Sequence, residues 1–399
     1  MAEKLAEVYE QYDMDIVSTR KGRGATILTT SDGYRILEPF RGNITRLEQE
    51  HVLKKLLLED GFSKVDAIIP NRDGQLLTCD KYRQPFVLKQ HFDGEECGMK
   101  NISDVKRSVR ALTNLHICGK AAASRFQTAW EQYEHEKEEK KFSEIRKAFA
   151  DGEELERIAH VYDIRETVLD EILKGPCAKD GTKEPGAQKK NETKMPDMVY
   201  KDINEIFIRH NKELKKIYRF INTVKQKNAF ENLFLKVFWD YYGQGIDCVK
   251  MLEDKNITKQ VYDKHYGICH GNYNQHNVLL CEDGEAIVHF ERFSKGNQLN
   301  DLYQFSRKVM EKNNFDLTLL EAILKEYNKK ISLEREDYRY IYILFSYPEK
   351  FWKIANGYYN TNKAFLSPKY VEKLETVILQ EKEKRDMLNK FSAFHLLDM

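Results

Sequence analysis

A polar loop followed by two short apolar runs, in residues 269–293, constrains the fold of this chain more than any other segment. The segment reads CHGNYNQHNVLLCEDGEAIVHFERF, and an Asp-Gly pair separates the apolar runs 278–280 and 286–290. A two-residue turn of this kind between apolar runs is typical of a β-hairpin. We therefore predict two antiparallel strands, which would bring Asn277 close to His289.

The first 92 residues also carry strand patterns. Alternating or β-branched runs bounded by turn residues predict five strands in this part of the chain. The predicted strands are residues 25–30, 34–37, 67–69, 76–79 and 85–91. Thr45 and Glu48 have the spacing of a capping box, which predicts a helix that starts there and runs to about Glu59.

From Ser103 onward, apolar residues recur at helical spacing, most clearly in residues 203–224 and 230–251. The chain is therefore predicted to be α+β, with a small β-rich part followed by a large helical part. A charged insertion spans about 130–198. Its end, 174–197, has few apolar residues and many Gly, Pro, Lys and Glu residues, so we expect a flexible linker there.

Composition excludes several classes of protein. The 65 basic and 64 acidic residues leave a formal net charge of +1, which gives no overall field for holding nucleic acid or an anionic membrane. Seven scattered cysteines without a CxxC pair favour a reducing compartment over a disulfide framework. We see no signal peptide and no stretch of membrane-span length, and so expect a cytoplasmic protein without membrane insertion.

The loop and hairpin carry a resemblance to a known family. His270-Gly271, Asn277 and the run Ile287–Glu291 resemble the catalytic core of aminoglycoside and choline kinases, whose pattern is H-G-D-x-x-x-x-N followed by I-D-F/W-D/E. The match is closer still to one branch, the CotS-type spore-coat proteins. Three further segments support it, namely residues 90–96, 209–221 and 347–365.

This resemblance implies a two-lobed, protein-kinase-like fold of the aminoglycoside phosphotransferase type. The N-terminal lobe would span residues 1–90 and hold a five-stranded sheet and one helix. Residues 91–96 would form the hinge between the lobes. Residues 97–399 would form the helical C-terminal lobe, which contains the charged insertion.

The resemblance also implies a nucleotide-binding cleft. Gly22 and Gly24 would lie in the lid over the phosphates, and backbone groups near Gln90 and Phe92 would meet the adenine ring. Glu50 would correspond to the helix glutamate that orients a phosphate-binding lysine.

That lysine itself is missing from its expected strand, where this chain has Leu37. Arg35 lies two residues earlier and would replace it if its side chain faced the cleft, because side chains of a strand repeat every second residue.

The catalytic positions also depart from the family pattern. The loop carboxylate that would accept a proton is replaced by Asn272, two residues after His270, and an amide cannot act as a general base. The metal-binding aspartate is replaced by His289, although Mg²⁺ prefers oxygen ligands. Asn277 and Glu291 are kept and would supply oxygens to a metal ion. By resemblance, Asp301 would steady the catalytic loop.

We therefore predict a pseudokinase with a structural or assembly role in the coat of a bacterial endospore. It would assemble from the mother-cell cytoplasm, with other coat proteins as partners. Two alternatives remain open: an active phosphotransferase that uses ATP and Mg²⁺ on a small-molecule substrate, and an ATP-binding switch without transfer. A zinc site of Cys269, His270, Cys281 and His289 is less favoured, because adjacent residues of an extended segment point to opposite sides.

Overall fold

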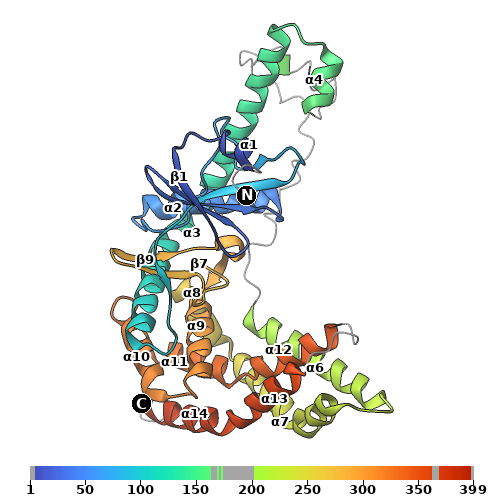
Figure 1. Cartoon of the computed structure of the whole chain (residues 1–399). Helices are drawn as coiled ribbons and strands as arrows, with labels where there is room; N and C mark the ends of the chain where they lie inside the picture. Colours follow the sequence, from blue (N-terminus) through green and yellow to red (C-terminus); the bar gives the residue numbers. More distant parts are fainter. Residues whose placement is uncertain (1–4, 163–168, 170–171, 174–201, 362–367, 397–399) are drawn as a thin grey trace, which may run out of the picture. The chain divides into compact units, whose positions relative to one another are not determined.

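The computed structural model describes residues 5–162, 169, 172–173, 202–361 and 368–396 (Figure 1). The chain divides into two compact units, one of residues 124–197 and the other of residues 1–123 and 198–399. The predicted linker at 174–197 lies outside the described residues. No described helix is both long enough and apolar enough to cross a membrane.

The N-terminal lobe is built on an antiparallel sheet in the order β1-β2-β3-β5-β4. Its strands are β1 (Ile16–Lys21), β2 (Thr26–Thr30), β3 (Gly33–Pro39), β4 (Thr78–Cys79) and β5 (Pro85–Gln90).

The predicted hairpin around Gly33 is confirmed, since β2 and β3 pair directly through it. The predicted strand 67–69 is wrong: Ile68 makes only an isolated bridge to Lys89. The fifth strand is β1 instead. Its side chains are mostly exposed at the edge of the sheet, so its polar sequence shows no apolar alternation.

The two faces of this sheet are covered by different elements. On one face, Leu37 of β3 packs in a cluster with Val8 of α1 (Ala6–Tyr9). On the other face, Val87 of β5 packs with Leu47 of α2 (Ile44–Glu59).

The predicted capping box at the start of α2 is wrong. Asn43 caps the helix instead, because its Oδ1 accepts a hydrogen bond from Arg46 N at 3.0 Å. The helix therefore begins two residues earlier than a cap at Thr45 would allow and ends at Glu59, as predicted.

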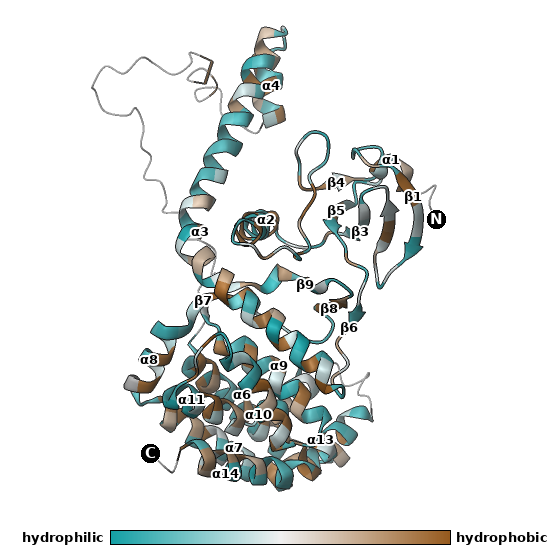
Figure 2. Cartoon of the chain, turned by 90° about the vertical axis from the view of Figure 1, so that its left-hand side faces the viewer, coloured by the Kyte–Doolittle hydropathy of each residue, from teal (hydrophilic) through white to brown (hydrophobic). Residues whose placement is uncertain are grey.

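The chain leaves the sheet through the hinge and immediately pairs with the second lobe. β6 (Glu95–Glu96) pairs with β8 (Val278–Cys281), which pairs in turn with β9 (Gly284–Ile287). Figure 2 shows this small sheet between the N-terminal sheet and the helices. The predicted hairpin is confirmed, but its second strand ends at Ile287, because residues 290–292 form a 3₁₀ helix, η2 (Phe290–Arg292).

Nine described helices follow or flank this hairpin in the C-terminal lobe. They are α6 (Ile203–Thr223), α7 (Ala229–Leu252), α8 (Lys255–His265), α9 (Leu299–Lys312), α10 (Leu317–Asn328), α11 (Arg335–Ser346), α12 (Glu349–Asn360), α13 (Lys369–Leu379) and α14 (Glu381–His395). The two helices predicted at 203–224 and 230–251 are confirmed to within one residue at each end. A second small sheet joins β7 (Tyr266–Cys269) to β10 (Ser294–Asn297).

Aromatic side chains dominate the core of this lobe. Phe234 and Phe238 of α7 are fully buried and pack with Phe351 and Tyr358 of α12. The Phe234 and Phe351 rings stack with centroids 5.3 Å apart. This core joins α6 and α7 to α12 and α13.

The smaller unit has its own apolar cluster, formed by Ile145, Ile158, Leu169 and Ile172. Ile145 belongs to α3 (Ile102–Ala150), and Ile158 belongs to α4 (Leu155–Tyr162). Buried isoleucine and leucine in a segment of such high charge show that part of the insertion is a packed structure in its own right.

Candidate active site

Asp301, in the first turn of α9, anchors the loop that follows β7. One carboxylate oxygen accepts a hydrogen bond from the His270 amide at 2.5 Å, and the other accepts one from the Gly271 amide at 3.0 Å. The Asp301 side chain is buried, and backbone amides satisfy its charge. The structure therefore places Asp301 where it holds the predicted catalytic loop in position.

His270 links this loop to the hairpin through both of its ring nitrogens. Nδ1 accepts from the Asn272 amide at 3.2 Å, so Nε2 carries the proton and donates to the Val288 carbonyl at 3.0 Å. Burial lowers the pKa of His270, which keeps the imidazole neutral. His270 is thus a positioning residue, and with both nitrogens used it does not offer a zinc ligand together with Cys269.

Gly271 allows a close backbone approach that a larger residue would prevent. Its φ is +75°, and a Cβ built on it would lie 2.0 Å from the Arg292 carbonyl oxygen. The glycine of the His-Gly motif is therefore required for the loop to pass against η2.

Asn272 and Asn277 lie in contact within the loop. The Asn277 Nδ2 donates to the Asn272 carbonyl at 2.9 Å, and Asn274 Nδ2 donates to the same oxygen at 2.7 Å. The Asn277 carbonyl accepts a hydrogen bond from the Val288 amide at 3.0 Å, which connects the loop to the residue just before His289. Hydrogen bonds within the loop and to the hairpin therefore fix Asn272, the residue that the resemblance put at the position of the base.

His289 has a left-handed backbone, with φ 67° and ψ 61°. Its amide donates to Asp66 Oδ2 at 3.0 Å, which holds this strained conformation in place. Its Nδ1 lies 3.4 Å from Glu291 Oε1. The hydrogen bond to Glu291 raises the pKa of His289 above its usual value, although burial opposes this.

Lys89, at the end of β5, is the basic residue that the sequence analysis missed. Its side chain is buried, and four carboxylates surround its ammonium group. The distances from Lys89 Nζ are 3.0 Å to Glu291, 3.2 Å to Glu38, 3.8 Å to Glu50 and 4.0 Å to Asp66. Burial would lower the pKa of Lys89, but these carboxylates raise it well above 10.5, so the group is fully protonated.

A second buried ammonium lies beside the first. Lys54 Nζ is 2.5 Å from Glu50 Oε1 and 2.7 Å from Asp66 Oδ1. Glu50, the helix glutamate, is therefore held by a lysine of its own helix as well as by Lys89. Four carboxylates face two ammonium groups in this cluster, and the charge of the Arg46 guanidinium also acts on Glu50 and Glu291.

The hypothesis that Arg35 faces the cleft is wrong. Arg35 pairs with Gln90, and Ile36 pairs with Lys89, so the first pair lies on the opposite face of the sheet from the second. Arg35 lines a pocket beside Tyr12, and its Nη1 donates to the Tyr34 carbonyl at 2.9 Å. The Gln90 side chain also lies on that outer face, away from Lys89.

Glu38 is the charged residue of β3 on the face that carries Lys89. An acidic residue therefore stands on the strand where the resemblance predicted a lysine, and a lysine stands on the neighbouring strand. Leu37, where the lysine was expected, faces the other way and is fully buried against Val8. A lysine within the apolar run of residues 85–90 was the available sign that a buried cation lies on β5.

The lid and hinge residues lie near one another. Gly24 has a φ of +76° in the turn between β1 and β2, and the Gly22 amide donates to the Ala25 carbonyl at 2.9 Å. Arg23, at the tip of this turn, lies 3.5 Å from Glu96 of β6. Phe92 packs against the apolar cluster that contains Val288.

One group of side chains has the composition of a metal site. The donor atoms of Glu38, His289 and Glu291 all lie within 4.8 Å of one another. However, Lys89 Nζ contacts both carboxylates at 3.2 and 3.0 Å, so an ammonium already supplies the positive charge there. Mg²⁺ also prefers oxygen to the imidazole nitrogen at position 289. These residues do not fit Mg²⁺ in the way that kinases hold it.

Comparison with known proteins agrees with this geometry. Residues 190–391, half of the chain, match the family model described as "Spore coat putative kinase YutH". The chain belongs to the YutH family of spore coat proteins. The resemblance to CotS-type proteins is thereby confirmed.

Solved structures show the fold of this YutH-family chain. An aminoglycoside phosphotransferase from Alicyclobacillus acidocaldarius matches with a TM-score of 0.68 and 13% identity, over 96% of this chain and 94% of that one. The AMP-bound spectinomycin phosphotransferase APH(9)-Ia matches with a TM-score of 0.51 and 12% identity, over 94% and 98%. None of the curated proteins matches this chain in sequence. The predicted two-lobed fold of the aminoglycoside phosphotransferase type is confirmed.

Proposed function

We propose that this chain is a pseudokinase of the spore coat, which serves coat structure or assembly and does not transfer phosphate. The observation that carries this proposal is the enclosure of Lys89 by Glu38, Glu50, Asp66 and Glu291. A kinase needs a cation that is free to bind nucleotide phosphates. Here the protein's own carboxylates take the place that the phosphates would need.

The charge of the cluster argues against a bound triphosphate. Lys54 and Lys89 neutralise two of the four carboxylates, and a protonated His289 would neutralise a third. The Arg46 guanidinium also interacts with Glu50 and Glu291, so the carboxylates already have cationic partners and the phosphates of ATP would have to compete with them for Lys89. To bind ATP, the protein would have to separate Lys89 from Glu38 and Glu291, which leaves buried carboxylates without partners at a cost of several kcal/mol.

The catalytic loop supports the same proposal. Asn272 is held at the position of the base, where an amide cannot accept the proton of an acceptor hydroxyl, and loss of a general base costs roughly 10²–10⁴ in rate. His289 keeps the left-handed backbone of the hairpin end but offers nitrogen in place of a carboxylate. The frame of the site is therefore intact, whereas its reactive groups are replaced.

Titration of the full chain with ATP, with and without Mg²⁺, tests this proposal. A ligand that binds the folded state raises the melting temperature, by mass action. We expect no shift with millimolar ATP or Mg-ATP, and no release of ADP. A shift together with turnover that is lost in Asn277→Ala would contradict the proposal.

An active phosphotransferase is a second candidate, favoured by one observation. Lys89 lies 3.8 Å from Glu50, which is the kind of lysine–glutamate pair that active kinases use. In that case Lys89 would do from β5 what the family lysine does from β3. A third result, ATP-dependent stabilisation without turnover, would assign the protein as a nucleotide-binding switch.

The coat role requires a test in cells. We propose that the protein assembles with other coat proteins from the mother-cell cytoplasm, as membership of a spore coat family suggests. A fluorescent fusion of the full chain should collect around the developing spore, and Asn277→Ala should collect there equally well. Uniform fluorescence throughout the mother cell would count against a coat role.

A further inference from the structure

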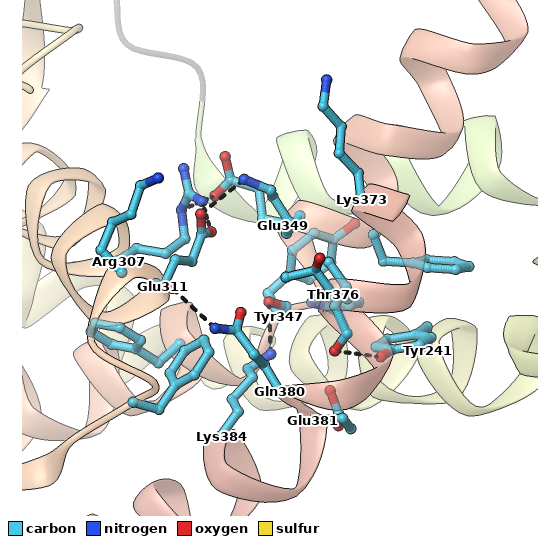
Figure 3. Close-up of a pocket in the computed structure, with 17 residues that line it drawn as sticks. Tyr241, Arg307, Glu311, Tyr347, Glu349, Lys373, Thr376, Gln380, Glu381 and Lys384 are labelled. Atoms are coloured by element: carbon cyan, nitrogen blue, oxygen red, sulfur yellow. Dashed lines mark hydrogen bonds and ion pairs between the residues drawn. The ribbon is translucent and has the colours of Figure 1, made fainter. Parts of the chain in front are cut away.

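A separate cavity of about 190 Å³ lies in the C-terminal lobe (Figure 3). Its walls come from α7, α9, α11, α12, α13 and α14 and from the short segments between them. None of its lining residues belongs to the catalytic loop, the hairpin or the N-terminal sheet. Whatever binds there would therefore do so independently of the nucleotide cleft.

One wall of this cavity is aromatic. The rings of Tyr241 and Phe351 stack with centroids 4.4 Å apart and an interplanar angle of 13°. Both side chains are buried, as are those of Phe345 and Tyr347. Such a wall favours a flat apolar group through burial and ring stacking.

A strained backbone presents a further ring. Asn314 and Phe315 follow α9 with φ values of 49° and 55°, in the left-handed region that bulky residues rarely adopt. The Phe315 amide donates to the Met310 carbonyl at 3.0 Å, which fixes this turn. Strain of this kind persists where the surrounding structure holds it, often at binding sites. Here it places Phe315 among the lining residues.

The acidic residues of the cavity are all engaged by other side chains. Glu311 pairs with Arg307 and also lies 2.9 Å from Lys350. Glu349 lies 2.5 Å from Lys353 and accepts a hydrogen bond from the Tyr303 hydroxyl at 3.1 Å.

The third acid, Glu381, is engaged in the same way. It accepts from Gln244 Nε2 and pairs with Arg385 Nε, both at 2.8 Å. A cationic ligand would thus find no carboxylate that is free to receive it.

Lys384 is in the opposite situation. Its ammonium lies 3.4 Å from the carbonyl of Tyr347 (Figure 3) and 3.4 Å from that of Ser346. Within the described part of the chain, no carboxylate lies within ion-pair distance of it. Burial lowers the pKa of Lys384, as expected for an ammonium that lacks an acidic partner.

The charge of the lining points the same way. Five basic and three acidic side chains line the cavity, which leaves a surplus of two positive charges. Lys308, on the adjoining turn of α9, has its pKa lowered to about 8 by burial and by the charges of Arg307 and Lys353. The cavity is therefore electropositive although the whole chain is nearly neutral.

We propose that this cavity binds a small monocyclic aromatic carboxylate, with the ring on the aromatic wall and the carboxylate on Lys384. The size fits, because a cavity of about 150 Å³ holds a benzene ring. A single carboxylate matches the Lys384 ammonium between the carbonyls of Ser346 and Tyr347, whereas a doubly charged phosphate would face three carboxylates of the wall. This site goes beyond the pseudokinase proposal and does not depend on it.

Calorimetric titration of the full chain with benzoate tests this inference. Benzoate should bind, whereas benzylamine, which has the same ring and the opposite charge, should not. Lys384→Met should weaken benzoate binding at least tenfold, and Lys384→Arg should retain it. Lys382→Met, an exposed change on the same helix, should bind benzoate like the wild type.

Circular dichroism and the melting temperature establish that each variant is folded. Failure of folded wild-type protein to bind benzoate at millimolar concentration would overturn the inference. Equal binding of benzoate by Lys384→Met, or binding of benzylamine as tight as that of benzoate, would do the same. Tighter binding of phenyl phosphate than of benzoate would show that the ligand is a phosphate and would overturn the proposed carboxylate class.

Discussion

The Lys89 ammonium lies 3.2 Å from the Glu38 carboxylate, on the neighbouring strand of the N-terminal sheet. In this pair the acid stands on β3 and the base on β5, whereas the family pattern puts the base on β3. The lobe thus keeps a buried cation near Glu50 but surrounds it with acids. We propose that this pair decides whether the cleft accepts a nucleotide.

Glu38→Gln should increase the affinity of the cleft for ATP. Glutamine keeps the shape of the side chain and removes one negative charge beside Lys89, so we expect ATP binding to become measurable, at least tenfold (about 1.4 kcal/mol) tighter than the millimolar limit at which the wild type shows none. Calorimetric titration measures it. The control is the exposed Glu10→Gln at the end of α1, and equal ATP affinity in both variants would show that Glu38 does not block the site.

Lys89→Met should destabilise the protein by about 3–5 kcal/mol, because it leaves buried carboxylates without their cation. Urea unfolding measures the loss. The exposed Lys21→Met on β1 is the control and should change stability by less than about 0.5 kcal/mol. Adding Glu38→Gln to Lys89→Met should recover part of the loss, since the two side chains are in contact. Full additivity would refute the coupling.

Asp301→Asn should lower the free energy of unfolding by about 2–3 kcal/mol. The carboxylate accepts bonds from two backbone amides, and hydrogen bonds to a charged group contribute about 1.5–3 kcal/mol each. The amide nitrogen of asparagine would instead face one of these donors. Asp263→Asn, on the exposed surface of α8, is the matched change. A similar small loss in both variants would exclude an anchoring role for Asp301.

Gly271→Ala should prevent the loop from adopting its observed conformation. The new Cβ would lie 2.0 Å from the Arg292 carbonyl, in addition to the strain of a φ of +75°. Gly61→Ala separates the two effects, because its φ is +87° and no atom lies within 4 Å of the added Cβ. We expect a loss of about 1–2 kcal/mol for Gly61→Ala and clearly more for Gly271→Ala. Thermal unfolding compares them, and equal losses would contradict the predicted clash.

Stability should fall as pH drops from 6.5 to 4, in part through His210. Burial, and then the charge of Arg209, lowers the pKa of His210 to about 4 in the folded protein, where its ring stacks on Trp352. The unfolded chain takes up this proton near pH 6.5 and the folded chain does not, so the contribution present above pH 6.5 is lost on acidification.

His210→Phe keeps a flat ring and removes this titration. Relative to the variant, the wild type should lose about 1–2 kcal/mol between pH 7 and pH 4.5. Urea unfolding at several pH values measures the difference. The exposed His135→Gln should track the wild type throughout, and a pH-independent difference between wild type and His210→Phe would show that His210 does not titrate in this way.

Local sequence patterns predicted the turns and helices that depend on interactions between residues close together in the sequence. The Asp-Gly turn of the β8–β9 hairpin, the helical spacing of α6 and α7 and the His-Gly motif all depend on interactions within a few residues. The edge strand β1 escaped prediction because nothing covers most of its side chains and no apolar period marks it. The cap of α2 was misplaced because Asn43 competes with Thr45 for the same role.

By itself, the sequence determined which reactive groups are absent from the catalytic loop and hairpin, since Asn272 and His289 are read directly from the motif. Only the tertiary structure decided where the charges of the cleft lie. Residues far apart in the sequence, Lys89 and Glu291, meet at 3.0 Å because the hairpin of one lobe packs beneath the sheet of the other. Side chains alternate along β3, so Arg35 faces outward and Glu38 faces the cleft. The pairing of β3 with β5 therefore decides that β3 contributes a negative charge to the cleft, and no local pattern shows this.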